Sequence, residues 1–257
     1  MKKLLALLTA LYCAGAVRAA IHTESVEYQQ GGTTLAGFMA YEDTIKGPRP
    51  GVLIVHQWKG LTDYEQKRAE MLAKLGYVAF CADIYGKGVR PTTPQDAGAE
   101  AGKYKRNRAL LRERVNAGLE TFRKQSVVDP KRIAAIGYCF GGTTVIELAR
   151  SGADIAGVVS FHGGLDSPAP ADGKNIKCKV LACHGADDPF EPAKDLEAFE
   201  SEMRNADVDW RLIKYGGAVH SFTDWKADGS MKGAKYNERA DKRSWEDMKA
   251  FFSEIFK

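Results

Sequence analysis

One cysteine stands at the centre of a Gly-x-Cys-x-Gly pattern at residues 137–141, followed by a further glycine. This is the pattern of a nucleophile elbow, a sharp turn between a strand and a helix that strains the backbone of the nucleophile. An apolar run precedes the turn at residues 132–136, and helix-forming residues follow it. The N-terminus of that helix would favour the thiolate form of Cys139. The spacing predicts a nucleophilic thiol; the alternative is a buried structural cysteine.

A nucleophile of this kind needs a base, and the base needs a carboxylate that orients it. In α/β-hydrolases the three residues follow one another in the order nucleophile, acid, histidine. Asp188 follows one later apolar run and His220 follows the next. The order predicts a triad of Cys139, Asp188 and His220 at the carboxyl ends of parallel strands, where ligand sites lie. Asp187 is the alternative acid.

The other four histidines are less well placed to act as the base. They are His22 near the N-terminus, His56 and His162 at the ends of apolar runs, and His184 before the acidic loop. Only His220 lies after the acid in the chain, so it is the predicted base.

The elements that must position these residues alternate between strand and helix. Strands are expected at residues 51–55, 77–82, 132–138, 156–161, 178–184 and 209–215, and helices include 63–75, 103–125 and 240–256. This alternation predicts a mostly parallel, doubly wound sheet. Together with the elbow and the order of the triad residues, it is typical of an α/β-hydrolase fold. Two strand-like segments flank Gly31 and Gly32 and predict an antiparallel N-terminal hairpin at the sheet edge.

Two polar segments, 90–98 and 223–237, are expected to border the pocket, either as lids or as plain surface loops. The helix expected at 103–125 begins with a run of basic residues. We interpret that run as a solvated face rather than as a binding patch. Its members are Lys103, Lys105, Arg106 and Arg108.

The first 19 residues have the pattern of a secretory signal peptide. Two lysines precede a short apolar run, and Val17-Arg18-Ala19 forms a plausible cleavage site; a membrane anchor is the alternative. Residues 20–257 are then expected to form a single, monomeric domain in the periplasm or outside the cell. The mature chain has 34 basic and 33 acidic residues. This balance gives no electrostatic reason to expect a nucleic-acid or membrane partner.

Four cysteines follow the signal. Cys81 and Cys183 lie inside apolar runs and Cys178 lies at the start of one, so we expect packed thiols rather than disulfides. No pair of cysteines has the spacing of a zinc site.

At these residues the chain resembles the dienelactone hydrolase family of α/β-hydrolases. Besides the elbow, four segments carry the resemblance: Val-His-Gln-Trp-Lys-Gly-Leu at 55–61, Ala-Asp-Ile-Tyr-Gly at 82–86, His-Gly-Ala-Asp-Asp-Pro-Phe at 184–190 and His-Ser-Phe at 220–222. The resemblance runs from about residue 51 to the C-terminus. Cysteine in the elbow, combined with these four segments, makes the resemblance specific.

The resemblance implies hydrolysis of a small ester, lactone or thioester through an acyl-cysteine, with no metal or organic cofactor. Cys139 would attack, His220 would transfer protons and Asp188 would fix the tautomer of His220. The backbone N–H groups of Phe140 and Trp58 would hold the oxyanion. The residues expected in the substrate pocket are Gln57, Tyr85, Lys87, Phe161 and Trp225. The alternatives are a general carboxylesterase or thioesterase, a peptidase, an acyltransferase, a redox protein and a non-catalytic binding protein.

Three positions depart from the family pattern. Gln57 stands where the type enzyme has a glutamate that holds the cysteine at rest, and glutamine cannot take a proton. Lys87 and Asp224 stand at positions of arginines that grip a substrate carboxylate. We therefore expect Cys139 to rest as a thiolate paired with His220, and we expect the dienelactone substrate to transfer poorly.

Overall fold

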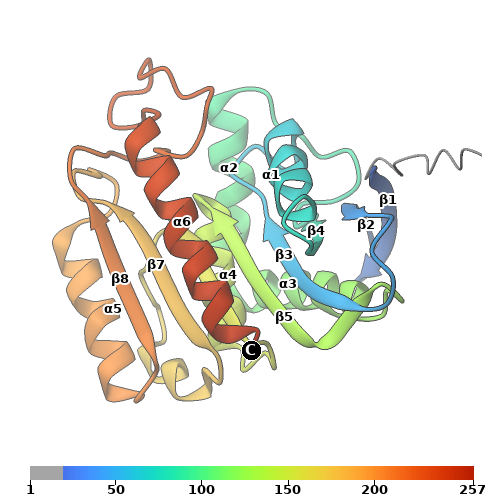
Figure 1. The fold of residues 1–257 in the computed structure, drawn as a ribbon. Coiled ribbons are helices and arrows are strands. Elements are labelled where there is room, and N and C mark those ends of the chain that lie inside the picture. Colours follow the sequence, from blue (N-terminus) through green and yellow to red (C-terminus); the bar gives the residue numbers. More distant parts are fainter. Residues whose placement is uncertain (1–19) are drawn as a thin grey trace, which may run out of the picture.

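The computed structural model describes residues 20–257, in which eight strands form one sheet (Figure 1). They are β1 Ile21–Gln30, β2 Thr33–Glu42, β3 Arg49–Val55, β4 Val78–Ala82, β5 Val128–Tyr138, β6 Gly157–Phe161, β7 Lys179–Gly185 and β8 Trp210–Tyr215. Their order across the sheet is β1-β2-β4-β3-β5-β6-β7-β8. The first two neighbouring pairs are antiparallel and the rest are parallel. The predicted fold class and hairpin edge are confirmed.

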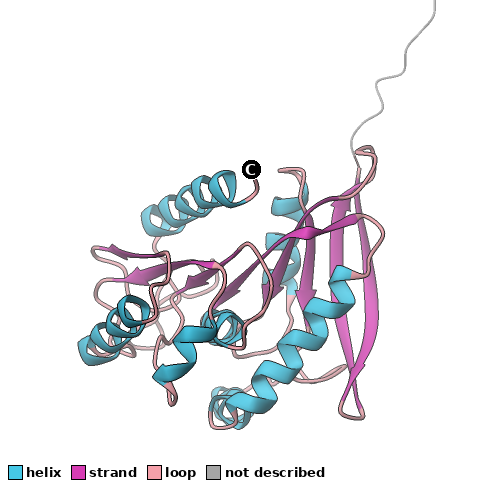
Figure 2. Ribbon diagram, turned by 90° about the horizontal axis from the view of Figure 1, so that it is seen from below, coloured by secondary structure: helices cyan, strands magenta, loops and turns pink. Residues whose placement is uncertain are grey.

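Helices cover both faces of the sheet (Figure 2). Helices α1 (Asp63–Ala73) and α6 (Glu238–Ile255) bury apolar side chains against one face. The opposite face is covered by α2 (Pro94–Lys105), α3 (Arg108–Arg123), α4 (Phe140–Arg150) and α5 (Ala193–Asn205), and η1 (Pro170–Asn175) is a short 3-10 helix. Each layer buries its own apolar cluster, which supplies most of the driving force for folding. The sheet is therefore a rigid platform whose carboxyl edge presents the loops.

The segment after β4 differs from the prediction. A loop was predicted at 90–98 and one helix at 103–125, but the structure has two helices with a break at Asn107. Thr93 caps α2 by accepting a hydrogen bond from the backbone N–H of Asp96, and Pro94 occupies the first turn, where its missing N–H costs nothing. Asn107 caps α3 in the same way. As a result α2, rather than a loop, borders the site.

The predicted signal peptide lies outside the described residues. Among the helices of residues 20–257, none is both long and apolar enough to cross a membrane.

All four cysteines in the described part of the chain are free thiols. Cys81, Cys178 and Cys183 are buried, and burial raises the pKa of each thiol above its usual range. Cys139 alone is half-buried. The prediction of packed thiols without disulfides agrees with this arrangement.

Candidate active site

Cys139 lies in a strained turn between β5 and α4, with φ 54° and ψ −116°. Only small residues allow this turn, because the chain passes very close to itself. A Cβ atom on Gly137 would lie 2.0 Å from the carbonyl oxygen of Gly141, and one on Gly141 would lie 2.1 Å from the carbonyl oxygen of Val55. The two glycines therefore let α4 start directly above β3 and β5, which presents Cys139 at the carboxyl edge of the sheet.

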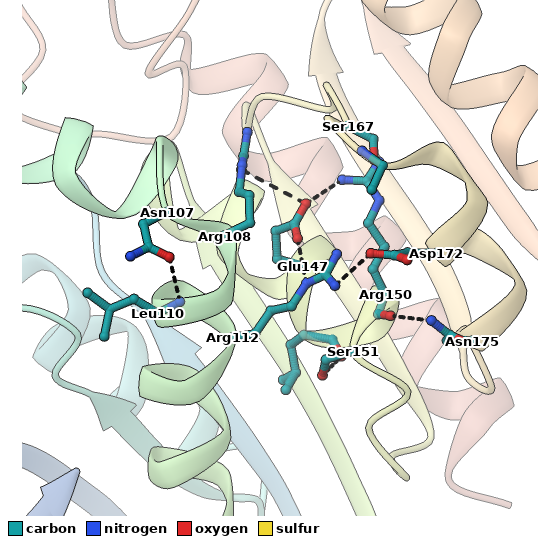
Figure 3. A network of polar contacts seen from close by, with 12 residues as sticks. Asn107, Arg108, Leu110, Arg112, Glu147, Arg150, Ser151, Ser167, Asp172 and Asn175 are labelled. Atoms are coloured by element: carbon teal, nitrogen blue, oxygen red, sulfur yellow. Dashed lines mark hydrogen bonds and ion pairs between the residues drawn. The ribbon is translucent and has the colours of Figure 1, made fainter. Parts of the chain in front are cut away.

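Buried ion pairs fix the helix that carries the nucleophile (Figure 3). Glu147 and Arg150 of α4 are fully buried and lie 2.8 Å apart. Arg150 also pairs with Glu202 of α5 at 2.6 Å, and Glu147 pairs with Arg112 of α3 at 2.8 Å. Breaking such a network by removing one partner costs about 3–5 kcal/mol, because it leaves an uncompensated buried charge. The network thus holds α4 against its neighbouring helices.

The three predicted catalytic residues form a hydrogen-bonded chain. The Nε2 atom of His220 lies 3.2 Å from the Sγ of Cys139, and its Nδ1 lies 2.8 Å from the Oδ2 of Asp188. The other carboxylate oxygen of Asp188 accepts the backbone N–H of Phe190 at 2.9 Å. Asp187 is exposed, and its side chain forms no hydrogen bond or ion pair within residues 20–257. The structure therefore brings together Cys139, His220 and Asp188, and leaves Asp187 outside.

The segment that follows β8 holds the backbone of His220. The N–H of His220 donates to the carbonyl of Gly233 at 3.1 Å, and its own carbonyl accepts the N–H of Lys235 at 2.9 Å. Ser221 adopts a positive φ of 57°, which turns the chain sharply after the histidine. The segment 223–237 thus holds the backbone of His220 in place through these hydrogen bonds.

The electrostatics of the site favour an ion pair between the thiol and the imidazole. Burial alone would raise the pKa of Cys139, but the charge and hydrogen bond of His220, together with the charge of Lys105, hold it below its usual value. Burial would lower the pKa of His220, yet its contacts with Cys139 and Asp188 raise it to about 10. The two shifts have the sense required for a thiolate beside an imidazolium at neutral pH.

Cys139 and His220 open into a cavity of about 370 Å³. Both expected oxyanion donors, Trp58 and Phe140, line it. The backbone N–H of Trp58 has no acceptor within residues 20–257, so it is free to bind a ligand. The N–H of Phe140 opens α4 and faces the sulfur, where it helps to lower the pKa of Cys139.

Gln57 lies in a second cavity of about 380 Å³, which adjoins the first and shares Trp58, Ser221 and Met231 with it. The side-chain amide of Gln57 donates to the carboxylate of Asp224 at 3.2 Å. Two positions that depart from the family pattern therefore bind each other, and neither side chain lines the Cys139 cavity.

The other residues expected in the pocket do not line the Cys139 cavity, and each has a local reason. Lys87 pairs with Glu27 of β1 at 2.6 Å on the surface. Tyr85 is buried and donates to the carbonyl of Trp58 at 3.0 Å, so it supports the oxyanion loop from behind. Phe161 is buried and stacks on a neighbouring tyrosine, with ring centroids 4.8 Å apart. Trp225 lies over a buried guanidinium, 4.4 Å from the ring centroid.

Two charged residues that line the cavity were not predicted from the sequence. Lys105, interpreted from the sequence as part of a solvated face, ends α2 and lines the cavity with no ion-pair partner within residues 20–257. Glu191 also lines the cavity, and burial raises its pKa to about 7. The capping signal at Asn107 could have revealed Lys105, because a new helix that begins there leaves Lys105 at the end of the preceding helix. No sequence signal marks Glu191 beyond its nearness to Asp188.

Comparisons with known proteins identify the family and the fold of the chain. The model of the dienelactone hydrolase family matches residues 35–256. The crystal structure of a dienelactone hydrolase-like promiscuous phosphotriesterase from metagenomic libraries superimposes with a TM-score of 0.89 and 39% identity, covering 93% of this chain and 100% of that one.

Two curated relatives show the same similarity. A putative carboxymethylenebutenolidase of Synechocystis is 27% identical over 85% of this chain and 91% of its own length. An uncharacterized protein of Caenorhabditis elegans is 34% identical over 57% of this chain and 94% of its own length. Together with the family match, these similarities place the chain among the hydrolases of esters and lactones: it belongs to the dienelactone hydrolase family.

Proposed function

We propose that this chain hydrolyses small esters or lactones by nucleophilic catalysis at Cys139, through an acyl-cysteine intermediate. The observation that carries the proposal is the hydrogen-bonded chain from Cys139 through His220 to Asp188, which opens into a cavity large enough for a small acyl group. The order of these atoms is that of a nucleophile, a base and a residue that orients the base.

In the first half of the reaction, the thiolate of Cys139 attacks the carbonyl carbon and the carbonyl oxygen becomes an oxyanion. The N–H groups of Trp58 and Phe140 donate to that oxyanion, and each such donor is typically worth about 3 kcal/mol of the barrier. His220 then gives its Nε2 proton to the leaving alkoxide. The alcohol of an ester departs, whereas the alcohol of an opened lactone stays attached to the acyl group, and in both cases a thioester remains on Cys139.

In the second half, water enters the position left by the alcohol. His220 takes a proton from it at Nε2, and the hydroxide adds to the thioester carbonyl. Collapse of the tetrahedral intermediate breaks the carbon–sulfur bond and releases the carboxylic acid. Cys139 and His220 return to their starting ion pair. The carboxylate of Asp188 keeps the Nδ1 proton in place throughout.

Gln57 supports a thiolate that stands ready before substrate binds. Its amide donates a hydrogen bond to Asp224 and neither gains nor loses a proton near neutral pH, so residue 57 cannot act as a protonation switch for the thiol. Cys139 instead has His220 as its direct partner. We therefore propose that substrate binding is not needed to form the nucleophile.

The substitution Cys139→Ala tests the proposal. We expect it to abolish turnover of an activated short-chain ester while circular dichroism and thermal unfolding remain those of the wild type. Mass spectrometry of the wild-type enzyme quenched during turnover should show one acyl group on the peptide that contains residue 139. Undiminished turnover in the alanine variant, or an acyl group elsewhere, would refute the proposal.

The substrate panel should contain esters and lactones with and without a free carboxylate. It should also contain a phosphotriester, because a structural neighbour with 39% identity is described as a promiscuous phosphotriesterase. Adding a competing alcohol separates hydrolysis from acyl transfer, since a transferase would form the new ester in place of the acid.

We further propose that the protein is exported, on the basis of the signal-like pattern of residues 1–19. N-terminal sequencing of the protein from cell fractions tests this. A mature chain that begins near residue 20 in the exported fraction supports export, and an intact N-terminus in the cytoplasm contradicts it.

A further inference from the structure

A second histidine contacts both Cys139 and His220 but does not line the cavity into which they open. His162 follows β6 directly and is fully buried. Its Nδ1 lies 3.1 Å from the backbone nitrogen of Cys139, and its Nε2 lies 2.7 Å from the Oγ1 of Thr223. Its ring meets the ring of His220 edge-on, with centroids 5.2 Å apart. His162 therefore connects the nucleophile to the segment that carries the base.

The hydrogen-bond donors fix the tautomer of His162. The backbone nitrogen of Cys139 can only donate, so Nδ1 of His162 must accept and carry no proton. The proton of the neutral ring is then on Nε2, where it donates to the Oγ1 of Thr223. A doubly protonated His162 would place two N–H groups face to face at Cys139.

His162 stays neutral even beside a charged base. Burial, the charge of His220 and the more distant charges of Arg68 and His184 all hold the pKa of His162 well below its usual range. The bridge therefore persists when His220 becomes an imidazolium, which is the state that the mechanism requires before the leaving group departs.

The far end of the bridge is firmly anchored. The hydroxyl of Thr223 lies 2.8 Å from the hydroxyl of Tyr64. The backbone carbonyl of Thr223 accepts an N–H of Arg68 at 3.1 Å. Arg68 is itself buried and paired with Asp241 of α6 at 2.5 Å. Thr223 is thus tied to both α1 and α6, and His162 extends this connection to the nucleophile.

Backbone strain gathers at the same place. Among residues 20–257, four residues other than glycine have a positive φ, and three of them lie at the site: Cys139, His162 and Ser221. Each such conformation costs about 1–3 kcal/mol and persists only where its surroundings hold it. The bridge joins Cys139 and His162, and it ends at Thr223, two positions after Ser221.

We propose that His162 is a positioning residue that sets the distance between the sulfur of Cys139 and the imidazole of His220, by bridging the backbone of the nucleophile to Thr223. This role deepens the proposed function, since it matters only if Cys139 and His220 react together. Without the bridge, Cys139 and His220 each remain after their own strands, but no hydrogen bonds through His162 fix the position of one relative to the other. The 3.2 Å contact between them then loosens, and His220 stabilises the thiolate less.

Two substitutions each remove the hydrogen bond between His162 and Thr223, one by changing the histidine and the other by changing the threonine. In His162→Asn, the amide oxygen can still accept the N–H of Cys139, but the shorter side chain cannot reach Thr223. In Thr223→Val, the shape is kept and the hydroxyl is lost. The N–H of Cys139 also donates to the carbonyl of Phe161 at 3.0 Å, so the elbow retains a hydrogen bond and we expect both variants to fold.

The first readout is the pKa of the Cys139 thiol, measured by the ultraviolet absorbance of the thiolate and by the pH dependence of alkylation. We expect both single variants to raise it by about one unit, and the double variant to raise it no further, because one link is lost in each case. We expect kcat to fall about tenfold to a hundredfold with KM nearly unchanged, as for a small misplacement of reacting groups. Thr223→Ser, which keeps the hydroxyl, should restore both values.

The matched control is Thr144→Val. It also removes a fully buried hydroxyl close to the elbow, one whose single hydrogen bond within residues 20–257 goes to the carbonyl of Phe140 in its own helix. A merely structural role for His162 would lower the melting temperature of the bridge variants as in the control and leave the thiol pKa unchanged. That result would overturn the proposal, as would additive effects in the double variant. The thiol titration uses no substrate, so its outcome is distinguishable from a failure of the proposed hydrolysis.

Discussion

Replacing Asp188 with asparagine tests the triad at the atom that fixes the tautomer of His220. The two carboxylate oxygens of Asp188 have separate partners, since one accepts the N–H of Phe190 at 2.9 Å and the other accepts the Nδ1 proton of His220 at 2.8 Å. Asparagine has only one oxygen. We expect that oxygen to stay with the backbone N–H of Phe190, which turns the amide NH₂ toward His220.

An NH₂ group at this position would force Nδ1 of His220 to accept, so the ring proton would move to Nε2. In that tautomer Nε2 faces Cys139 with a proton already on it, and it cannot take the proton of the thiol or of water. Loss of the orienting carboxylate in such triads lowers kcat by roughly 10⁴, which corresponds to about 5.5 kcal/mol of barrier.

The assay is steady-state hydrolysis of an activated ester, with the acylation burst measured separately. The matched control is Asp187→Asn, which makes the same chemical change at the adjacent, exposed residue. Because the Asp187 side chain has no hydrogen-bond partner within residues 20–257, we expect the control to change kcat less than about threefold, as for an ordinary surface substitution. An Asp188→Asn enzyme that keeps more than a tenth of the activity, or a larger loss in the control, would refute the reasoning.

Two further predictions follow from the same geometry. Lys105→Met should raise the thiol pKa, because the charge of Lys105 stabilises the thiolate, and the pH profile of alkylation should move upward; Lys103→Met, on the same helix but paired with Glu100, should leave the profile in place. Gly137→Ala should prevent folding or destabilise the protein by several kcal/mol, because its Cβ would overlap the carbonyl of Gly141. Chemical denaturation measures this, and a stability equal to that of the wild type would contradict the steric reading of the elbow.

The alternation of strands and helices was enough to predict the fold class, and the order of chemical groups along the chain nominated Cys139, Asp188 and His220, with Asp187 as the alternative acid. Each of the three lies just after an apolar run, and parallel strands all end at one edge of the sheet. Residues far apart in sequence must then meet there, so their proximity follows from topology alone.

The side chains of the pocket could not be predicted in this way, because their directions depend on partners from other elements. Lys87 forms an ion pair with Glu27 on the N-terminal hairpin, and the ring of Trp225 packs against the guanidinium of Arg68 on α1. Lys105 was misread because the break at Asn107 between α2 and α3 was missed. His162 looked like an ordinary strand-end histidine, and only the distances to its two partners reveal its place.

The burial of three thiols gives this protein a convenient property for the experimenter. Because Cys81, Cys178 and Cys183 are enclosed and poorly acidic, a mild alkylating reagent should react with Cys139 alone among residues 20–257. The amount of label bound would then count competent active sites in any preparation. The same arrangement concentrates oxidative damage at one sulfur, with no exposed thiol among those residues to capture a sulfenic acid as a reversible disulfide. The fraction of molecules that no longer takes up label would therefore measure how much of a preparation has been oxidised at Cys139.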